Sequence, residues 1–267
     1  MNLTKILTIV LLALSLYLFY FLYRGVQDTI DERNSIAVKE AVVIERLKLI
    51  RESEIVFQEI HGRFTSNWDS LITFIESGQV PIVERKEIIT QKPYGGEDVK
   101  IIVDTLGYIT ARERIFKKKY SANSSDYGIF MGYKVKVGDQ VLINQKAYVI
   151  KVGDKLNEVP FIEKGMIATL ASVNVGDALT KGQTLISFWD YMFNPNVDLK
   201  KLGEKEDGTK YEIFAGIVDK TGIKVQVIEV IDPTPANPLR KESNDSKNKK
   251  PLRFGSRTDV STAGNWE

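Results

Sequence analysis

Few residues of this chain could do acid–base or nucleophilic chemistry. Its 267 residues include one His and no Cys, which excludes thiolate nucleophiles, disulfides and Cys-ligated metals. No nucleophile-elbow or zinc motif surrounds His61. A carboxylate pair for glycan hydrolysis could be drawn from four residues: Asp190, Asp198, Glu204 and Glu206. Acidic residues are commonplace in turns, so we expect no catalytic residue, no metal and no cofactor.

A Val-Gly-Asp motif follows three strand candidates and favours reversal of the chain. The richest copy lies within residues 165–188, and another lies within residues 132–141. These segments resemble the two halves of lipoyl and biotinyl domains and of the barrel-sandwich domain of membrane-fusion adaptors. The resemblance implies a small β-barrel sandwich over about residues 130–190. The three copies are residues 137–139, 152–154 and 175–177.

Carrier domains of this kind modify a lysine at a turn, and Lys155 would fall near that place. The sequence there reads Asp154-Lys155-Leu156, which departs from the Asp-Lys-Ala or Met-Lys-Met of carrier domains. We therefore expect Lys155 to be an unmodified turn lysine. Membrane-fusion adaptors are the better analogy, although they insert a helical hairpin between the two halves. Here a long helix precedes the whole β-rich region.

The N-terminal segment is typical of a membrane anchor. Residues 6–23 contain no charged side chain, a length near the lower limit for crossing a bilayer. The run exceeds the apolar part of most signal peptides, and no small-residue cleavage site follows it. Aromatic residues gather at its far end, as they do at membrane interfaces. We expect an uncleaved single-pass anchor rather than a signal peptide.

The orientation of this anchor follows weakly from charge, because Lys5 precedes it and Arg24 and Arg33 follow. A short N-terminal tail before a large domain is the layout of a bacterial signal anchor. We therefore expect a bacterial inner-membrane protein, with residues 1–5 in the cytoplasm and the C-terminal domain in the periplasm.

A long helical stalk is predicted after the anchor, over residues 24–78. Apolar residues recur at steps of three, four or seven, which gives the helix one apolar face. Such a face needs a partner, and we expect a coiled-coil-like homo-oligomer. The alternative is a shorter helix, kinked near Gly62, whose end packs on the downstream domain. The residues of the expected oligomer seam are Ile30, Ala37, Ile44, Leu47 and Ile50.

The remaining chain divides into a β-rich head and a tail. Short β-branched runs alternate with Gly, Asp and Asn turns over residues 79–231. Residues 232–267 open with a Pro-, Asn- and Lys-rich stretch, which predicts disorder. Three large apolar residues near the end indicate docking on a partner or on the head: Leu252, Phe254 and Trp266. The fold class is therefore α+β, ending in a disordered tail.

Two segments resemble a family of uncharacterised single-pass membrane proteins of Bacteroidetes-type bacteria. They are the run FTSNWDSLITFIESGQVPIV (64–83) and the ending LRFGSRTDVSTAGNWE (252–267). The run YEIFAGIVDKTGIKVQVIEV (211–230) is also similar. The Val-Gly-Asp region looks like an insertion relative to that family. The resemblance implies an architecture and a cell type but no activity.

Three functions compete on these grounds. The leading expectation is a non-enzymatic structural or scaffold protein of the cell envelope, whose head and tail bind envelope proteins. An adaptor-like subunit of a transport or secretion assembly is the first alternative, and a carboxylate-dependent hydrolase the second. The 37 basic and 35 acidic residues give no basic excess, so we expect no nucleic-acid partner.

Overall fold

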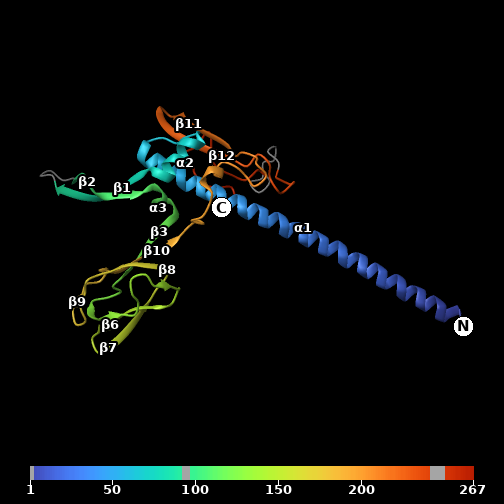
Figure 1. The fold of residues 1–267 in the computed structure, drawn as a ribbon, viewed down its shortest axis with the longest axis horizontal. Coiled ribbons are helices and arrows are strands. Elements are labelled where there is room, and N and C mark those ends of the chain that lie inside the picture. Colours follow the sequence, from blue (N-terminus) through green and yellow to red (C-terminus); the bar gives the residue numbers. More distant parts are fainter. Residues whose placement is uncertain (1–2, 92–96, 241–249) are drawn as a thin grey trace. The chain divides into compact units, whose positions relative to one another are not determined.

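The computed structural model describes residues 3–91, 97–240 and 250–267. The chain forms two compact units, one made of residues 1–51 and 201–267 and the other of residues 52–200. Figure 1 labels helices and strands of both units where there is room. The α+β class is confirmed, because a long N-terminal apolar helix precedes a region of antiparallel sheets.

Helix α1 (Leu3–His61) begins with the anchor segment. This part is long and apolar enough to cross a membrane, and its described side chains are exposed from Leu7 to Tyr23. Figure 1 shows the same helix continuing without interruption beyond the apolar segment. The anchor and the helix that follows it are therefore one element.

The stalk expected over residues 24–78 is not one helix, and that prediction is wrong. α1 ends at His61 because Gly62 takes a φ of 70°, a left-handed conformation that glycine adopts at helix C-termini. A second helix, α2 (Trp68–Ser77), starts at Asn67, whose side chain accepts a hydrogen bond from the Ser70 N–H at 3.1 Å. The break near Gly62 was the alternative left open by the sequence.

The first unit contains a three-stranded antiparallel sheet of order β11-β12-β13. β11 (Glu212–Lys220) and β12 (Ile223–Ile231) form a hairpin, and β13 (Arg253–Gly255) pairs with the end of β12. The described part of the expected disordered tail is thus ordered, which corrects that prediction. The linker residues 241–249 lie outside the described residues.

In the second unit, β1 (Gln79–Gln91) and β2 (Glu97–Thr110) form a long two-stranded hairpin. Helix α3 (Ala111–Phe116) follows β2. The Ala111 N–H donates to the Gly78 carbonyl at 2.8 Å, so the end of α2 and the start of α3 meet at the base of the hairpin.

The rest of the second unit consists of two four-stranded antiparallel sheets, of order β3-β10-β8-β5 and β7-β6-β4-β9. Their buried side chains form one hydrophobic cluster that includes Phe130, Tyr148, Ile167 and Phe188. A short 3-10 helix, η1 (Leu199–Lys201), comes after the last strand. The strands are β3 (Lys117–Asn123), β4 (Gly128–Tyr133), β5 (Gln140–Val141), β6 (Lys146–Val152), β7 (Lys155–Pro160), β8 (Gly165–Leu170), β9 (Ala178–Leu179) and β10 (Thr184–Tyr191).

Two of the Val-Gly-Asp turns occupy equivalent places in this two-sheet domain. The Gly138 N–H donates to the Ile167 carbonyl at 2.9 Å. The Gly176 N–H donates to the Phe130 carbonyl at 2.8 Å. The turn at residues 137–139 thus binds β8, and the turn at residues 175–177 binds β4. One half contains β4 and the first of these turns, the other contains β8 and the second, and the two halves interlock as an internal repeat.

The aspartates of these turns have a structural role. An Asp139 side-chain oxygen accepts a hydrogen bond from the Lys136 N–H at 2.8 Å. Asp177 accepts one from the Asn174 N–H, also at 2.8 Å. Each carboxylate closes its own turn, which explains why the motif needs an acid directly after glycine.

The repeat extends to a pair of glycines at the start of β4 and β8. A Cβ atom added at Gly128 would lie 2.6 Å from the Lys151 carbonyl oxygen, and one added at Gly165 would lie 2.6 Å from that of Trp189. Any side chain at either position would force neighbouring backbones apart. The same close strand approach thus occurs once in each half.

The two ends of the two-sheet domain lie beside each other. Lys117 at the start of β3 pairs with Tyr191 at the end of β10, and the Met192 N–H donates to the Phe116 carbonyl at 2.8 Å. Adjacent ends are the geometry that lets a domain be inserted in another.

A buried carboxyl group stabilises the turn after α1. Glu54 is fully buried, and one of its oxygens accepts a hydrogen bond from the Thr65 N–H at 3.0 Å. The other oxygen has no hydrogen-bond partner among the described residues. Burial raises the pKa of Glu54 from 4.5 to about 8, although the Thr65 N–H opposes the shift.

The raised pKa of Glu54 predicts a pH-dependent stability. Between pH 4.5 and about 8 the folded chain keeps a proton that the unfolded chain releases, so the free energy of unfolding falls as pH rises. The full effect is on the order of 5 kcal/mol. Thermal unfolding at pH 5 and pH 8 measures it, and Glu54→Gln should remove most of the difference. An equal pH dependence in both proteins would contradict the assignment.

Candidate functional site

The residues of the expected oligomer seam differ in how far they are buried. Ile30 and Ala37 are exposed and Ile44 is half-buried, whereas Leu47 and Ile50 have no exposed surface. The last two therefore belong to the core of the chain itself. The exposed members of the expected seam, Ile30 and Ala37, both lie before residue 43.

The three apolar residues expected to bind a partner are placed within the first unit. Leu252 is 1% exposed and Phe254 has no exposed surface, while Trp266 is half-buried. Phe254 pairs with Val230 of β12. Leu252 and Phe254 are core residues that a partner does not reach. Of the two expected docking surfaces, a partner or the head, Phe254 thus uses a strand of the head.

The segment after β12 returns to α1 through an ion pair. The Arg240 guanidinium donates to both carboxylate oxygens of Glu40, at 2.6 and 3.3 Å. It also donates to the Lys250 carbonyl at 3.2 Å. Both charged side chains are mostly buried, at 11% and 16% exposed, so removal of one would leave the other desolvated and unpaired.

A second contact joins the last described residues to α1. Arg51 donates to the Glu267 carboxylate at 2.6 Å, and its guanidinium lies 5.9 Å from the centre of the Trp266 ring. The Arg51 hydrogen bond lowers the pKa of Glu267. The tail is thus connected to the helix at two points, Glu40 and Arg51, which lie about three turns apart. We call residues 232–240 and 250–267 the C-terminal clamp.

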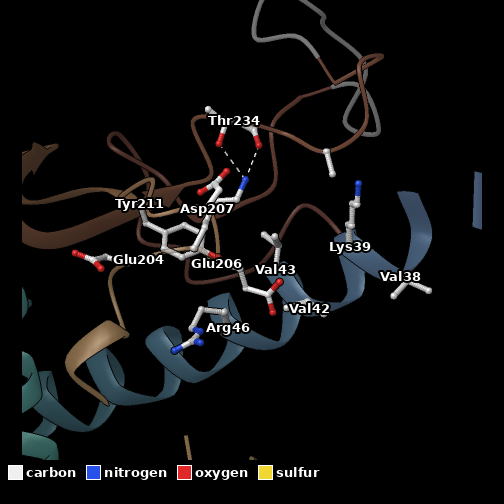
Figure 2. Close-up of a pocket in the computed structure, with 12 residues that line it drawn as sticks. Val38, Lys39, Val42, Val43, Arg46, Glu204, Glu206, Asp207, Tyr211 and Thr234 are labelled. Atoms are coloured by element: carbon white, nitrogen blue, oxygen red, sulfur yellow. Dashed lines mark hydrogen bonds between the residues drawn. The ribbon is translucent and has the colours of Figure 1, made fainter. Parts of the chain in front are cut away.

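A pocket of about 590 Å³ lies in the same unit. One wall is formed by α1, where Val42 and Val43 are apolar and Lys39 and Arg46 are charged (Figure 2). The opposite wall carries Tyr211 and acidic residues of the loop before it. The lining residues are Val38, Lys39, Val42, Val43, Arg46, Glu204, Lys205, Glu206, Asp207, Tyr211, Thr234 and Ala236.

The polar wall of the pocket is tied to the clamp. Lys205 donates to Asp232 at 2.8 Å. It also donates to the Thr234 hydroxyl at 3.0 Å, a bond that is dashed beside Thr234 in Figure 2. Burial, reinforced by the Asp232 charge, raises the pKa of Tyr211. Tyr211 therefore stays protonated at neutral pH. The pocket offers apolar contacts along α1 and a polar rim, which suits the binding of an amphipathic group.

The residues considered for acid–base chemistry occupy structural positions. His61 stacks on Phe57 with ring centres 4.1 Å apart, and its Nδ1 lies 3.0 Å from the Phe57 carbonyl. Asp190 lies 3.7 Å from Lys164, and Asp198 accepts a hydrogen bond from the Lys200 N–H.

The two glutamates belong to the other unit. Glu204 lies 3.7 Å from Lys210, and both Glu204 and Glu206 line the pocket. The four candidate carboxylates are thus divided between the two units. No described group of three or more His, Cys, Asp or Glu side chains could hold a metal ion.

Lys155 lies at the tip of the β6–β7 hairpin. It pairs with Val152 across a two-residue turn, where Gly153 takes a φ of 60°. The lysine is exposed, as a turn lysine would be. The Val-Gly-Asp copy at residues 152–154 therefore closes a hairpin. It differs in this from the copies at residues 137–139 and 175–177, which hold the interlocked halves.

Sequence reasoning did not identify the residues that hold the clamp. Glu40 and Arg51 are two of the many charged residues between the apolar positions of the predicted stalk, yet each binds the tail. Their partners lie some 200 residues away in the chain, Arg240 and Glu267. The apolar pattern of the tail was the usable signal, because it indicated docking without revealing the partner surface.

The comparisons with known proteins add little to this geometry. No protein-family model matches the chain, and no curated protein matches it. One similar solved structure is the Kluyveromyces lactis urea carboxylase, at 18% identity and a TM-score of 0.25. The similarity covers 27% of this chain and 6% of that one. A match of this extent carries no argument about fold or activity.

The burial of Phe254 predicts that the clamp stabilises the fold. Phe254→Ala would leave a cavity in the first unit and lower the free energy of unfolding by about 3–5 kcal/mol. Val260, 64% exposed, provides the control, since Val260→Ala should change stability by less than about 0.5 kcal/mol. Thermal unfolding of the full chain in detergent measures both. Equal stability of the two variants would show that Phe254 is not a core residue.

Proposed function

We propose that the chain is a membrane-anchored, non-enzymatic structural or scaffold protein of a bacterial cell envelope. Residues 6–23 cross the inner membrane, residues 1–5 stay in the cytoplasm and the rest lies in the periplasm. The observation that carries the proposal is the continuity of α1 (Leu3–His61). One helix leads from an exposed apolar segment to residues buried in the core.

This continuity has a mechanical meaning for a scaffold. Helix residues buried in the first unit, including Leu47 and Ile50, are joined to the anchor by uninterrupted backbone. The clamp adds Arg240 and Arg51 contacts on the same stretch of helix. A force or displacement of the head would therefore reach the membrane segment through a helix rather than through a flexible linker.

The stalk is proposed to self-associate through its exposed part. Ile30 is 44% exposed and Ala37 is also exposed, and they lie seven residues apart, the spacing of a coiled-coil seam. Homo-oligomer contacts there would leave the buried helix face, the clamp and the pocket unchanged. Envelope proteins would then bind the head.

Single-cysteine labelling tests the anchor and its orientation, because the natural chain has no Cys. The protein should remain in the membrane after carbonate washing, with its N-terminal segment uncut. In intact spheroplasts, Asp154→Cys should react with a membrane-impermeant maleimide, and Asn2→Cys should react only after lysis. A soluble species starting near Arg24, or the reverse labelling pattern, would refute the proposal.

An adaptor-like subunit of a transport or secretion assembly is the second candidate. It is favoured by the interlocked repeat of the two-sheet domain, which supports the proposal that this domain is of the barrel-sandwich type. In that case the domain between Phe116 and Met192 would supply the contacts with the assembly, and the rest of the chain would anchor it.

Excision of this domain separates the two candidates. Residues 117–191 can be replaced by a short Gly-Ser link, because Phe116 and Met192 already share a hydrogen bond. Arg112 also binds the Pro195 carbonyl at 2.7 Å, which holds the two flanks together. The shortened chain should insert in the membrane and melt within a few degrees of the original.

Crosslinked pull-downs from membranes then locate the partner surface. An adaptor domain predicts that excision removes the crosslinked partners, whereas a scaffold acting through the first unit predicts that they remain. Lys155→Ala is the matched control, since it keeps the domain and removes only the lysine of the hairpin tip. Loss of partners in both variants would instead locate the contact at the lysine of the hairpin tip.

A further inference from the structure

The β1–β2 hairpin of the second unit carries an apolar face that the described residues leave exposed. In the described part of the chain the two strands form a sheet of their own with no third strand. Directly paired residues share a face, as Val83 does with Thr105 and Ile89 with Val99. Exposed fractions of 42–57% are found for the apolar residues of this face: Val83, Ile89, Val99, Ile101 and Val103.

A hairpin of this kind is poorly stabilised by itself. Two strands alone are marginally stable in water, and a third strand or a packed layer is needed for independent stability. The outer edge of β2 (Glu97–Thr110) also presents unpaired backbone donors and acceptors, which favour the addition of another strand.

The sequence of β2 is complementary to itself in the antiparallel direction. If Ile102 faces Ile102 of another copy, Ile101 faces Val103 and Val99 faces Thr105. In the same register Lys100 of each copy faces Asp104 of the other copy. Opposite charges and β-branched residues that face each other stabilise an antiparallel pair.

The charges within the hairpin support this register. Asp104 lies directly opposite Glu84, a like-charge pair that destabilises a sheet. Lys100 lies opposite Ile88. Among the described residues no ion pair involves Lys100 or Asp104, while Glu84 lies 3.4 Å from Lys86. A lysine from outside would offset the charge of Asp104.

We propose that β2 pairs antiparallel with β2 of a second copy of this chain, centred on Ile102, so that two hairpins form one four-stranded sheet of order β1-β2-β2-β1. The backbone edge supplies the hydrogen bonds, and Lys100 with Asp104 sets the register. The apolar faces of the two hairpins become one continuous surface. This interface is separate from the stalk seam of α1.

Disulfide trapping in membranes tests the pairing on the full-length chain. Facing residues of an antiparallel pair have Cα atoms about 4.5–5.5 Å apart, within the range of a disulfide. Ile102→Cys should therefore form a covalent dimer under mild oxidation. Lys86→Cys, on the outer strand and on the same face, is the control, because three strand spacings of roughly 14 Å separate the two copies.

Charge exchange tests the register independently. Lys100→Asp and Asp104→Lys, each added to Ile102→Cys, should lower the disulfide yield about tenfold. The combination of both changes should restore it, which a simple folding defect would not. Ile30→Asp in the stalk should leave the yield unchanged.

The outcomes are distinct. No dimer with Ile102→Cys, or an equal yield with Lys86→Cys, overturns the proposal. Failure of the charge-exchanged double variant to recover overturns the register. If Ile30→Asp abolishes the disulfide, the hairpins meet only because the stalks do, and the proposed interface is wrong.

Discussion

The burial of one face of α1 is the interaction on which the first unit depends. Leu47 and Ile50 lie without exposed surface, on a helix that is fully exposed toward its N-terminus. In proteins, packing of an apolar face contributes more to the stability of a helix than intrinsic propensity does. The C-terminal clamp contributes to that packing, because Phe254 fills the core and Arg240 and Arg51 make the polar contacts at its edge.

The second unit shows a different use of the same chain. Its two-sheet domain is closed by turns that each half donates to the other, so neither half can form its core alone. The domain begins and ends at neighbouring positions of β3 and β10. The helices and the hairpin outside it are joined to one another by separate contacts, such as that of Ala111 with Gly78.

Periodicity and turn chemistry were sufficient for part of this architecture. The apolar run of residues 6–23, the β-rich region and the repeated Val-Gly-Asp turns are local patterns, and all appear in the structure. The tail was misjudged because Pro, Asn and Lys dominate residues 232–251, while β13 has only three residues. A strand so short leaves no periodic signal.

The residues that matter in the site were harder to identify for a physical reason. Glu40 and Glu54 look alike in the sequence, each a charged residue on a helix. One is held by Arg240 and the other is buried as a proton-binding acid. Whether a helix residue is buried depends on segments that are distant in the chain, so its burial cannot be predicted from the residues next to it in the sequence. Leu47 and Ile50 failed as seam residues on the same grounds.

The distance in sequence between Glu40 and Arg240, 200 residues, has a consequence for biosynthesis. At about 5–20 residues per second, the ribosome needs roughly 10–40 s to supply the clamp after the helix has emerged. During that interval the continuous domain of residues 117–191 can mature, while the apolar side of α1 waits uncovered. The high contact order of the first unit makes it the last part of the chain to assemble. A chaperone that shields nascent apolar helices would serve this chain during that interval.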